Sequence, residues 1–128
     1  MTIQDVLTQS DLSNCCVIKI DIEGSELDVK EQIAELAKMD VAILLSLHPP
    51  FWSISSHHAA SALIAALRGF RVWTANGKEL DSSEIRAMIE YNGDSPPPWG
   101  TRWGNFFELV LKPRAPMAQI WRRITGAA

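Results

Sequence analysis

The chain has 128 residues, of which 47% are hydrophobic and 21% are charged, and its formal net charge is −3. This length is typical of a single domain, and the composition excludes disordered and fibrous proteins. The weakly acidic balance excludes the broad basic surface with which proteins bind nucleic acid. No apolar run reaches the ~18 residues of a membrane span, and the first residues lack a signal-peptide pattern. We therefore expect a cytoplasmic protein.

The first half of the chain alternates between strand and helix patterns. Residues 16–20 and 41–47 are predicted to be strands, because both are rich in β-branched or aliphatic residues. The second of these is apolar on both faces, which is typical of a parallel sheet covered by helices. Between them, apolar residues recur at helical spacing and predict an amphipathic helix over about 25–39.

The second half repeats this alternation. Helical spacing of apolar residues predicts a helix at 60–67, and residues 70–74 form the third expected strand. A capping-box pattern at 81–84 opens a further helix. After a long loop over 92–104, residues 105–111 supply the last strand, since this segment is again apolar.

This order of elements predicts an α/β fold: a sheet of about four strands, parallel for at least its first three, with flanking helices. Beyond the sheet, an apolar stripe among basic residues predicts an amphipathic tail helix over 114–128. Such a helix can lie on an anionic membrane surface, but we expect it to dock on the acidic body of the same chain.

Polar residues follow the first two predicted strands. Asp21 and Glu23 come directly after the first strand, and His48 follows the second. Ligands of open α/β sheets bind outside the carboxyl ends of the strands, so we expect these side chains to share one crevice. Two carboxylates and an imidazole can hold a divalent cation or deprotonate a hydroxyl group. The alternative is that the acids cap the next helix, as we expect of Glu26, and that His48 is structural.

The segment Ile18–Glu26, with the sequence IKIDIEGSE, resembles the K-hydrophobic-D-hydrophobic-E-G-x-E motif of the FkbM family of S-adenosylmethionine-dependent methyltransferases. By this resemblance, residues 1–113 correspond to the C-terminal portion of the family's domain. It implies a partial Rossmann-like methyltransferase sheet, mostly parallel with an antiparallel last strand. It also implies methyl transfer to a hydroxyl group of a sugar or other metabolite. Asp21, Glu23 and His48 match positions that line the reaction crevice.

The family holds its cofactor on a glycine-rich loop after a strand, and these 128 residues contain no such pattern. We therefore expect the C-terminal half of a methyltransferase, inactive by itself until complemented by an N-terminal half. S-adenosylmethionine as the cofactor is implied by the resemblance alone. Two other functions stay open. One is a non-catalytic interaction domain, or half of a split enzyme, that pairs through its first strand, with a homo-oligomer among the outcomes. The other is a metal-dependent hydrolase that uses Asp21 and Glu23.

The long loop carries residues suited to ligand binding. Trp99, Arg102 and Trp103 can stack on a small-molecule acceptor, or they can anchor the loop to the core. The adjacent residues His57 and His58 do not share a helix face, so we expect them to be solvated rather than to form a metal site.

Overall fold

The computed structural model describes residues 17–114, which form a five-stranded mixed sheet and three α-helices. The strands are β1 (Val17–Ile20), β2 (Ala42–Leu47), β3 (Phe70–Thr74), β4 (Glu79–Leu80) and β5 (Phe107–Pro113). The helices are α2 (Lys30–Leu36), α3 (Ser56–Ala66) and α4 (Ser82–Ile89), with 3-10 turns η2 (Glu26–Val29) and η3 (Pro49–Phe51). The predicted α/β class is confirmed. None of the described helices is long and apolar enough to cross a membrane. The tail helix predicted at 114–128 lies outside the described residues, apart from its first residue.

The strand order in the sheet is β1-β2-β5-β3-β4. Strands β1 and β2 pair in parallel, whereas β5 is antiparallel to both of its neighbours, β2 and β3. Among the described strands only the β1–β2 pairing is parallel, so the mostly parallel sheet is not confirmed. The sheet is mixed because the last strand, β5, inserts between β2 and β3 and runs antiparallel to both. Because β5 opposes both of them, β1, β2 and β3 run in one direction, and their carboxyl ends lie at the same edge.

Strand β4 is absent from the sequence prediction, because two residues are too few to show an alternating pattern. It forms a hairpin with β3, in which Val72 pairs with Leu80. The Asn76-Gly77 dipeptide, with Gly77 at a φ of +93°, is the hairpin signal that marks this turn in the sequence.

The helix predicted over 25–39 is shorter and starts differently. Its first turn is the 3-10 turn η2, and α2 ends at Leu36. The tight first turn accompanies the inward position of Glu26, whose side chain is buried. The periodicity of apolar residues predicts a regular α-helix from its first turn. The structure instead has a 3-10 turn there, which carries the buried Glu26 side chain.

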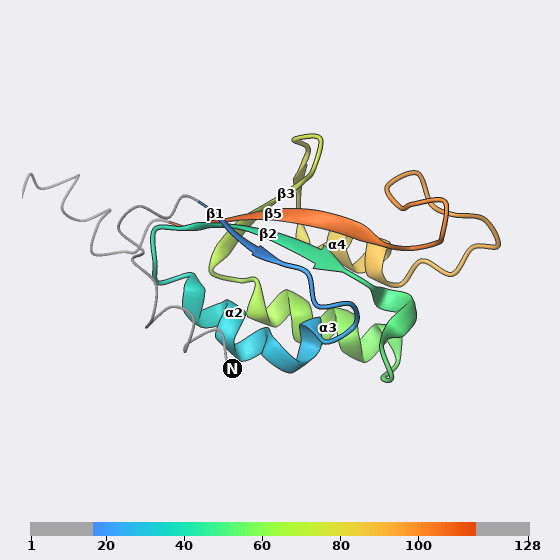
Figure 1. Ribbon diagram of the computed structural model, residues 1–128, viewed down its shortest axis with the longest axis horizontal. Coiled ribbons are helices and arrows are strands. Elements are labelled where there is room, and N and C mark those ends of the chain that lie inside the picture. Colours follow the sequence, from blue (N-terminus) through green and yellow to red (C-terminus); the bar gives the residue numbers. More distant parts are fainter. Residues whose placement is uncertain (1–16, 115–128) are drawn as a thin grey trace, which may run out of the picture.

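The hydrophobic core lies between the helices and one face of the sheet, and Figure 1 shows α2 and α3 beneath that sheet. Alternate residues of the two central strands point into this core, as the two-residue period of a strand requires. They are Ile43, Leu45 and Leu47 of β2 and Phe107, Leu109 and Leu111 of β5. The helices contribute Ile33, Leu36, Ala60, Leu63, Ile85, Met88 and Ile89. On the opposite face of β5, Glu108 and Lys112 are exposed and Val110 is partly exposed.

Candidate functional site

Glu26 is the only buried residue with a charged side chain among residues 17–114, and it is 0% exposed. Its Oε2 accepts a hydrogen bond from the indole Nε1 of Trp52 at 2.8 Å. Its Oε1 accepts a hydrogen bond from the backbone N–H of Gly24 at 3.3 Å and contacts Nδ1 of His48. Burying a carboxylate costs free energy unless its oxygens are hydrogen-bonded, and these contacts offset that cost for Glu26.

His48 connects this buried carboxylate to the surface. Its side chain is 15% exposed, and while Nδ1 faces Glu26, its Nε2 lies 3.6 Å from Oδ1 of Asp21, which is 43% exposed. Asp21 follows β1 and His48 follows β2, and the parallel pairing of these strands brings the two together. A carboxylate behind one ring nitrogen fixes the ring and its tautomer. With Nδ1 donating to Glu26, Nε2 carries the lone pair of the neutral ring, which can accept a proton from a ligand that reaches it beside Asp21.

Aromatic rings pack against one flank of His48. Its ring stacks on Phe51 with centroids 6.0 Å apart and an interplanar angle of 4°, and it lies 5.6 Å from the ring of Phe106. Phe51 and Phe106 also contact each other at 5.1 Å. The imidazole is thus held by packing as well as by Glu26, and the half-exposed Phe51 offers an apolar surface beside it.

The turn between β1 and η2 contains two residues with positive φ, Glu23 at 46° and Gly24 at 105°. A Cβ atom on Gly24 would lie 2.8 Å from Cβ of Phe51, so only glycine allows this turn to approach η3. Glu23 is exposed, and no contact within the described residues joins it to Asp21 or His48. The structure therefore brings together two of the three expected catalytic residues and leaves Glu23 on the turn beside them.

Replacing Gly24 with alanine is expected to lower the free energy of unfolding by about 2–3 kcal/mol, from the left-handed backbone and from the clash with Phe51. Gly77→Ala is the matched control, because Gly77 has a φ of +93° and no atom within 4 Å of an added Cβ. It reports the backbone cost alone, about 1 kcal/mol. Urea unfolding of both variants measures the difference. Equal losses would mean that the approach to Phe51 is unimportant.

Glu26 and Trp52 are the site residues that sequence reasoning missed. Glu26 is predicted to cap the next helix, and it does accept the Gly24 N–H, but its other partners are His48 and Trp52. That assignment is corrected because the side chain points into the protein instead of remaining solvated. The partners lie 22 and 26 residues away, which no local pattern reveals. The one signal in the sequence is that Glu26 closes the motif at 18–26.

The loop residue Trp99 anchors its segment to the protein body. Its Nε1 donates a hydrogen bond to Oδ1 of Asn105 at 2.9 Å, and its ring meets Tyr91 edge-to-face at 5.4 Å. Trp99 also packs against the hydrophobic core. These contacts support the alternative in which Trp99 anchors the loop, and Trp99 also lines a cavity of about 540 Å³.

Arg102 and Trp103 lie farther out on the same loop. The Arg102 guanidinium lies 4.4 Å from the centroid of the Trp103 ring, and Trp103 is 73% exposed. Both line a cavity of about 320 Å³ together with Pro50 of η3. Pro50 belongs to η3, the turn that directly follows His48, but His48 does not line this cavity.

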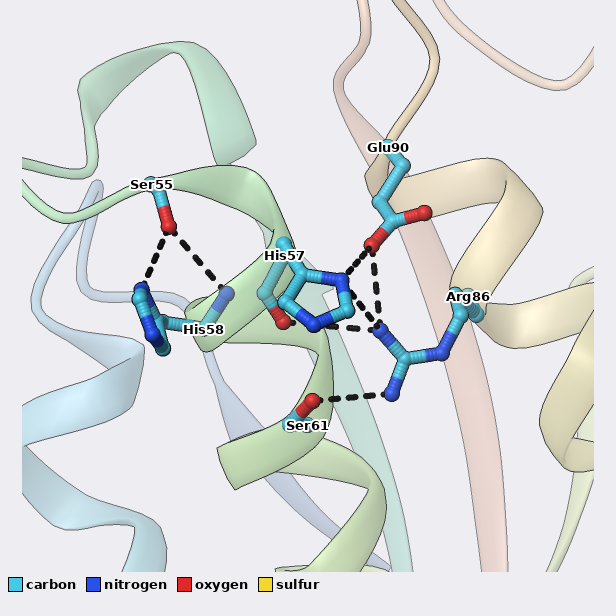
Figure 2. Close-up of polar contacts among 6 residues, drawn as sticks. All are labelled: Ser55, His57, His58, Ser61, Arg86 and Glu90. Atoms are coloured by element: carbon cyan, nitrogen blue, oxygen red, sulfur yellow. Dashed lines mark hydrogen bonds and ion pairs between the residues drawn. The ribbon is translucent and has the colours of Figure 1, made fainter.

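His57 and His58 belong to a different cluster, shown in Figure 2. Nδ1 of His57 lies 3.1 Å from Oε1 of Glu90, which also accepts a hydrogen bond from Arg86 at 3.0 Å. Ser55 caps α3: its Oγ accepts the backbone N–H of His58 and contacts that ring at 2.7 Å. The cluster joins α3 to α4 at the surface, which is a structural role.

Within residues 17–114, no three His, Cys, Asp or Glu side chains gather into a group suited to a metal ion. No family model, no curated protein and no solved structure matches the chain. The features that indicate a function are therefore the geometry around His48 and the sequence motif at residues 18–26.

Proposed function

We propose that this chain is the acceptor-binding part of an S-adenosylmethionine-dependent O-methyltransferase of the FkbM type. In this proposal His48 takes the proton from the hydroxyl group of a sugar or another small metabolite. The observation that carries it is the position of His48, with Nδ1 against buried Glu26 and Nε2 3.6 Å from Asp21. These groups lie at the carboxyl ends of two parallel strands, which is where α/β proteins bind ligands.

The chemistry of methyl transfer requires such a group. A hydroxyl oxygen that gains a methyl group must lose its proton, and a neutral imidazole is well suited to accept it. Glu26 keeps the ring oriented, and the Asp21 carboxylate is close enough to stabilise the imidazolium that results. Phe51 and Phe106 exclude water from one flank of the ring.

The described residues do not build a cradle for the cofactor. The glycine in the turn after β1 is Gly24, and the space beside it is filled by Phe51. We therefore include in the proposal that the cofactor is held by a complementing segment or chain. The position of β1 at the edge of the described sheet supports this, because an edge strand can be extended by further strands. The antiparallel β5 next to β2 also agrees with the expected sheet.

The test mixes the purified chain with a separately purified cofactor-binding half of an FkbM-family methyltransferase, radiolabelled S-adenosylmethionine and a panel of sugars and polyols. We expect label transfer in the mixture and none with either part alone. His48→Asn is expected to reduce the transfer by about 100-fold or more, which is the usual contribution of a general base. His58→Asn is the matched control, because that exposed histidine belongs to the cap of α3.

Two outcomes contradict the proposal: no label transfer to any acceptor, or equal transfer by His48→Asn and the unmodified chain. Tight binding of S-adenosylmethionine by the chain alone would instead contradict the complementation part of it.

A non-catalytic interaction domain is the second candidate, and the edge position of β1 favours it equally. Light scattering separates the two candidates. A dimer or higher oligomer that gives no methyl transfer would support the interaction domain.

A further inference from the structure

Trp52 binds the Glu26 oxygen that does not contact His48. The indole Nε1 of Trp52 donates to Oε2 of Glu26 at 2.8 Å, and this is the contact that residues 17–114 give to that oxygen. The other two partners of the carboxylate, His48 and the backbone N–H of Gly24, both meet Oε1. Because Glu26 is fully buried, loss of the indole N–H would leave Oε2 without a hydrogen bond inside the protein.

The contact at Oε2 fixes the plane of the carboxylate. The torsion that turns a carboxyl group has broad minima, so the glutamate side chain does not set this plane by itself. Partners at Oε1 alone would let the group turn about that oxygen, whereas partners at both oxygens prevent it. An indole N–H can only donate, so the atom opposite Trp52 must be an acceptor oxygen. Trp52 therefore keeps Oε1 directed at Nδ1 of His48.

Trp52 and His48 reach Glu26 from one short segment. The 3-10 turn η3 lies between them and has proline in its first two positions. A hydrogen bond from the Trp52 N–H to the Pro49 carbonyl, at 3.1 Å, closes this turn. Proline fixes the backbone angle φ, and the Trp52 ring also packs against the hydrophobic core. The indole donor is therefore held on a segment with little conformational freedom.

We propose that Trp52 is a positioning residue that sets the tautomer of His48. By holding Oε2, it presents Oε1 to Nδ1 as an acceptor, so the neutral ring carries its proton on Nδ1 and its lone pair on Nε2. The opposite tautomer has no lone pair on Nε2 and cannot take a proton there. The catalytic value of this arrangement rests on the proposed methyl transfer, whereas the tautomer itself does not depend on it.

Nuclear magnetic resonance tests the tautomer directly. Two-bond ¹H–¹⁵N correlation spectra of the ¹⁵N-labelled chain, recorded at a pH that leaves the rings neutral, distinguish a protonated ring nitrogen from one with a lone pair. The chain has three histidines, and His48→Asn identifies the signals of His48. We expect a single tautomer, with the proton on Nδ1. Trp52→Phe keeps an aromatic ring but lacks the N–H, and we expect it to give a mixture of both tautomers.

Trp99→Phe is the matched control. It also deletes an indole N–H that donates to a buried side chain, here Oδ1 of Asn105 at 2.9 Å. Each of the two variants loses one hydrogen bond of this kind, so we expect similar losses of stability. Only Trp52→Phe should change the signals of His48. Mixed tautomers in both variants would contradict the proposal, because general destabilisation would then explain the change.

Glu26→Gln tests the same inference if Trp52→Phe does not fold, since glutamine has nearly the shape of glutamate. Its amide has one acceptor oxygen. Trp52 can only donate, and its contact of 2.8 Å is shorter than the 3.3 Å contact with Gly24, so we expect Trp52 to hold that oxygen. The NH₂ group then faces Nδ1, which must accept a hydrogen bond. We therefore expect the proton of His48 to move to Nε2.

In the complementation mixture, Trp52→Phe is expected to lower kcat about threefold to tenfold, since only part of the rings would keep the productive tautomer. KM for the acceptor should not change, because Trp52 acts through the imidazole. The proton on Nε2 in the unmodified chain, or an unchanged Nδ1–H tautomer in Trp52→Phe or Glu26→Gln, would overturn the proposal. The expected spectra without any methyl transfer would support the tautomer and contradict the proposed function alone.

Discussion

Replacing Glu26 with alanine is expected to lower the free energy of unfolding by about 3 kcal/mol, the typical result of removing one partner from a buried polar network. The substitution leaves the Trp52 indole N–H without its acceptor, and it removes the carboxylate that contacts Nδ1 of His48. It also opens a small cavity, because Glu26 is fully buried. Urea unfolding followed by circular dichroism measures the loss.

The control for this variant is Glu31→Ala, one turn along on α2. The Glu31 side chain is 75% exposed and pairs with Lys30 at the surface, so the unfolding midpoint should not change measurably. An unchanged midpoint for Glu26→Ala as well would mean that the carboxylate does not hold the segment in place. In that case the proposed orientation of His48 would lose its basis.

Leu109→Ala is expected to lower the free energy of unfolding by about 3 kcal/mol, which lies within the range for a leucine removed from a closed core. Leu109 is 0% exposed and lies on β5, which pairs with both β2 and β3. Loss of its side chain leaves a cavity on the core face of the central strand of the described sheet, where strands on both sides limit how far the surroundings can relax. The same urea experiment reports the change.

The neighbouring residue provides an internal comparison. Val110 points to the opposite face of the same strand and is partly exposed, so Val110→Ala is expected to cost less than about 1 kcal/mol. Similar losses for the two variants would show that the second face of the sheet is also covered by packed side chains. A large difference would support a core confined to the helix side.

Local patterns predicted the elements of this fold better than their arrangement. The continuous apolar run of β2 and the capping box at the start of α4 depend on neighbouring residues, and both elements form where these patterns indicate. The position of β5 between β2 and β3 depends on contacts with Ile43–Leu47 and Phe70–Thr74. These segments are far from β5 in the sequence, and no periodicity specifies which strand it will join.

The same distinction applies to the candidate site. Asp21 and His48 each stand at the end of an evident strand, and their approach to 3.6 Å follows from the pairing of those strands. Glu26 is different, because a glutamate at the start of a helix is ordinarily solvated. Its burial under Trp52 requires a residue 26 positions away, which follows two prolines in a segment without regular periodicity.

The position of β5 in the sheet affects how the polypeptide folds while it is being synthesised. This strand is the last of the described elements to be synthesised, yet it is the bridge between the β1–β2 pair and the β3–β4 hairpin. A nascent chain that ends before Phe107 would therefore display two separate ribbons, each with an open edge. Such edges are prone to aggregate, and high contact order slows their closure. We expect C-terminally truncated translation products of this gene to depend on chaperones or to be degraded.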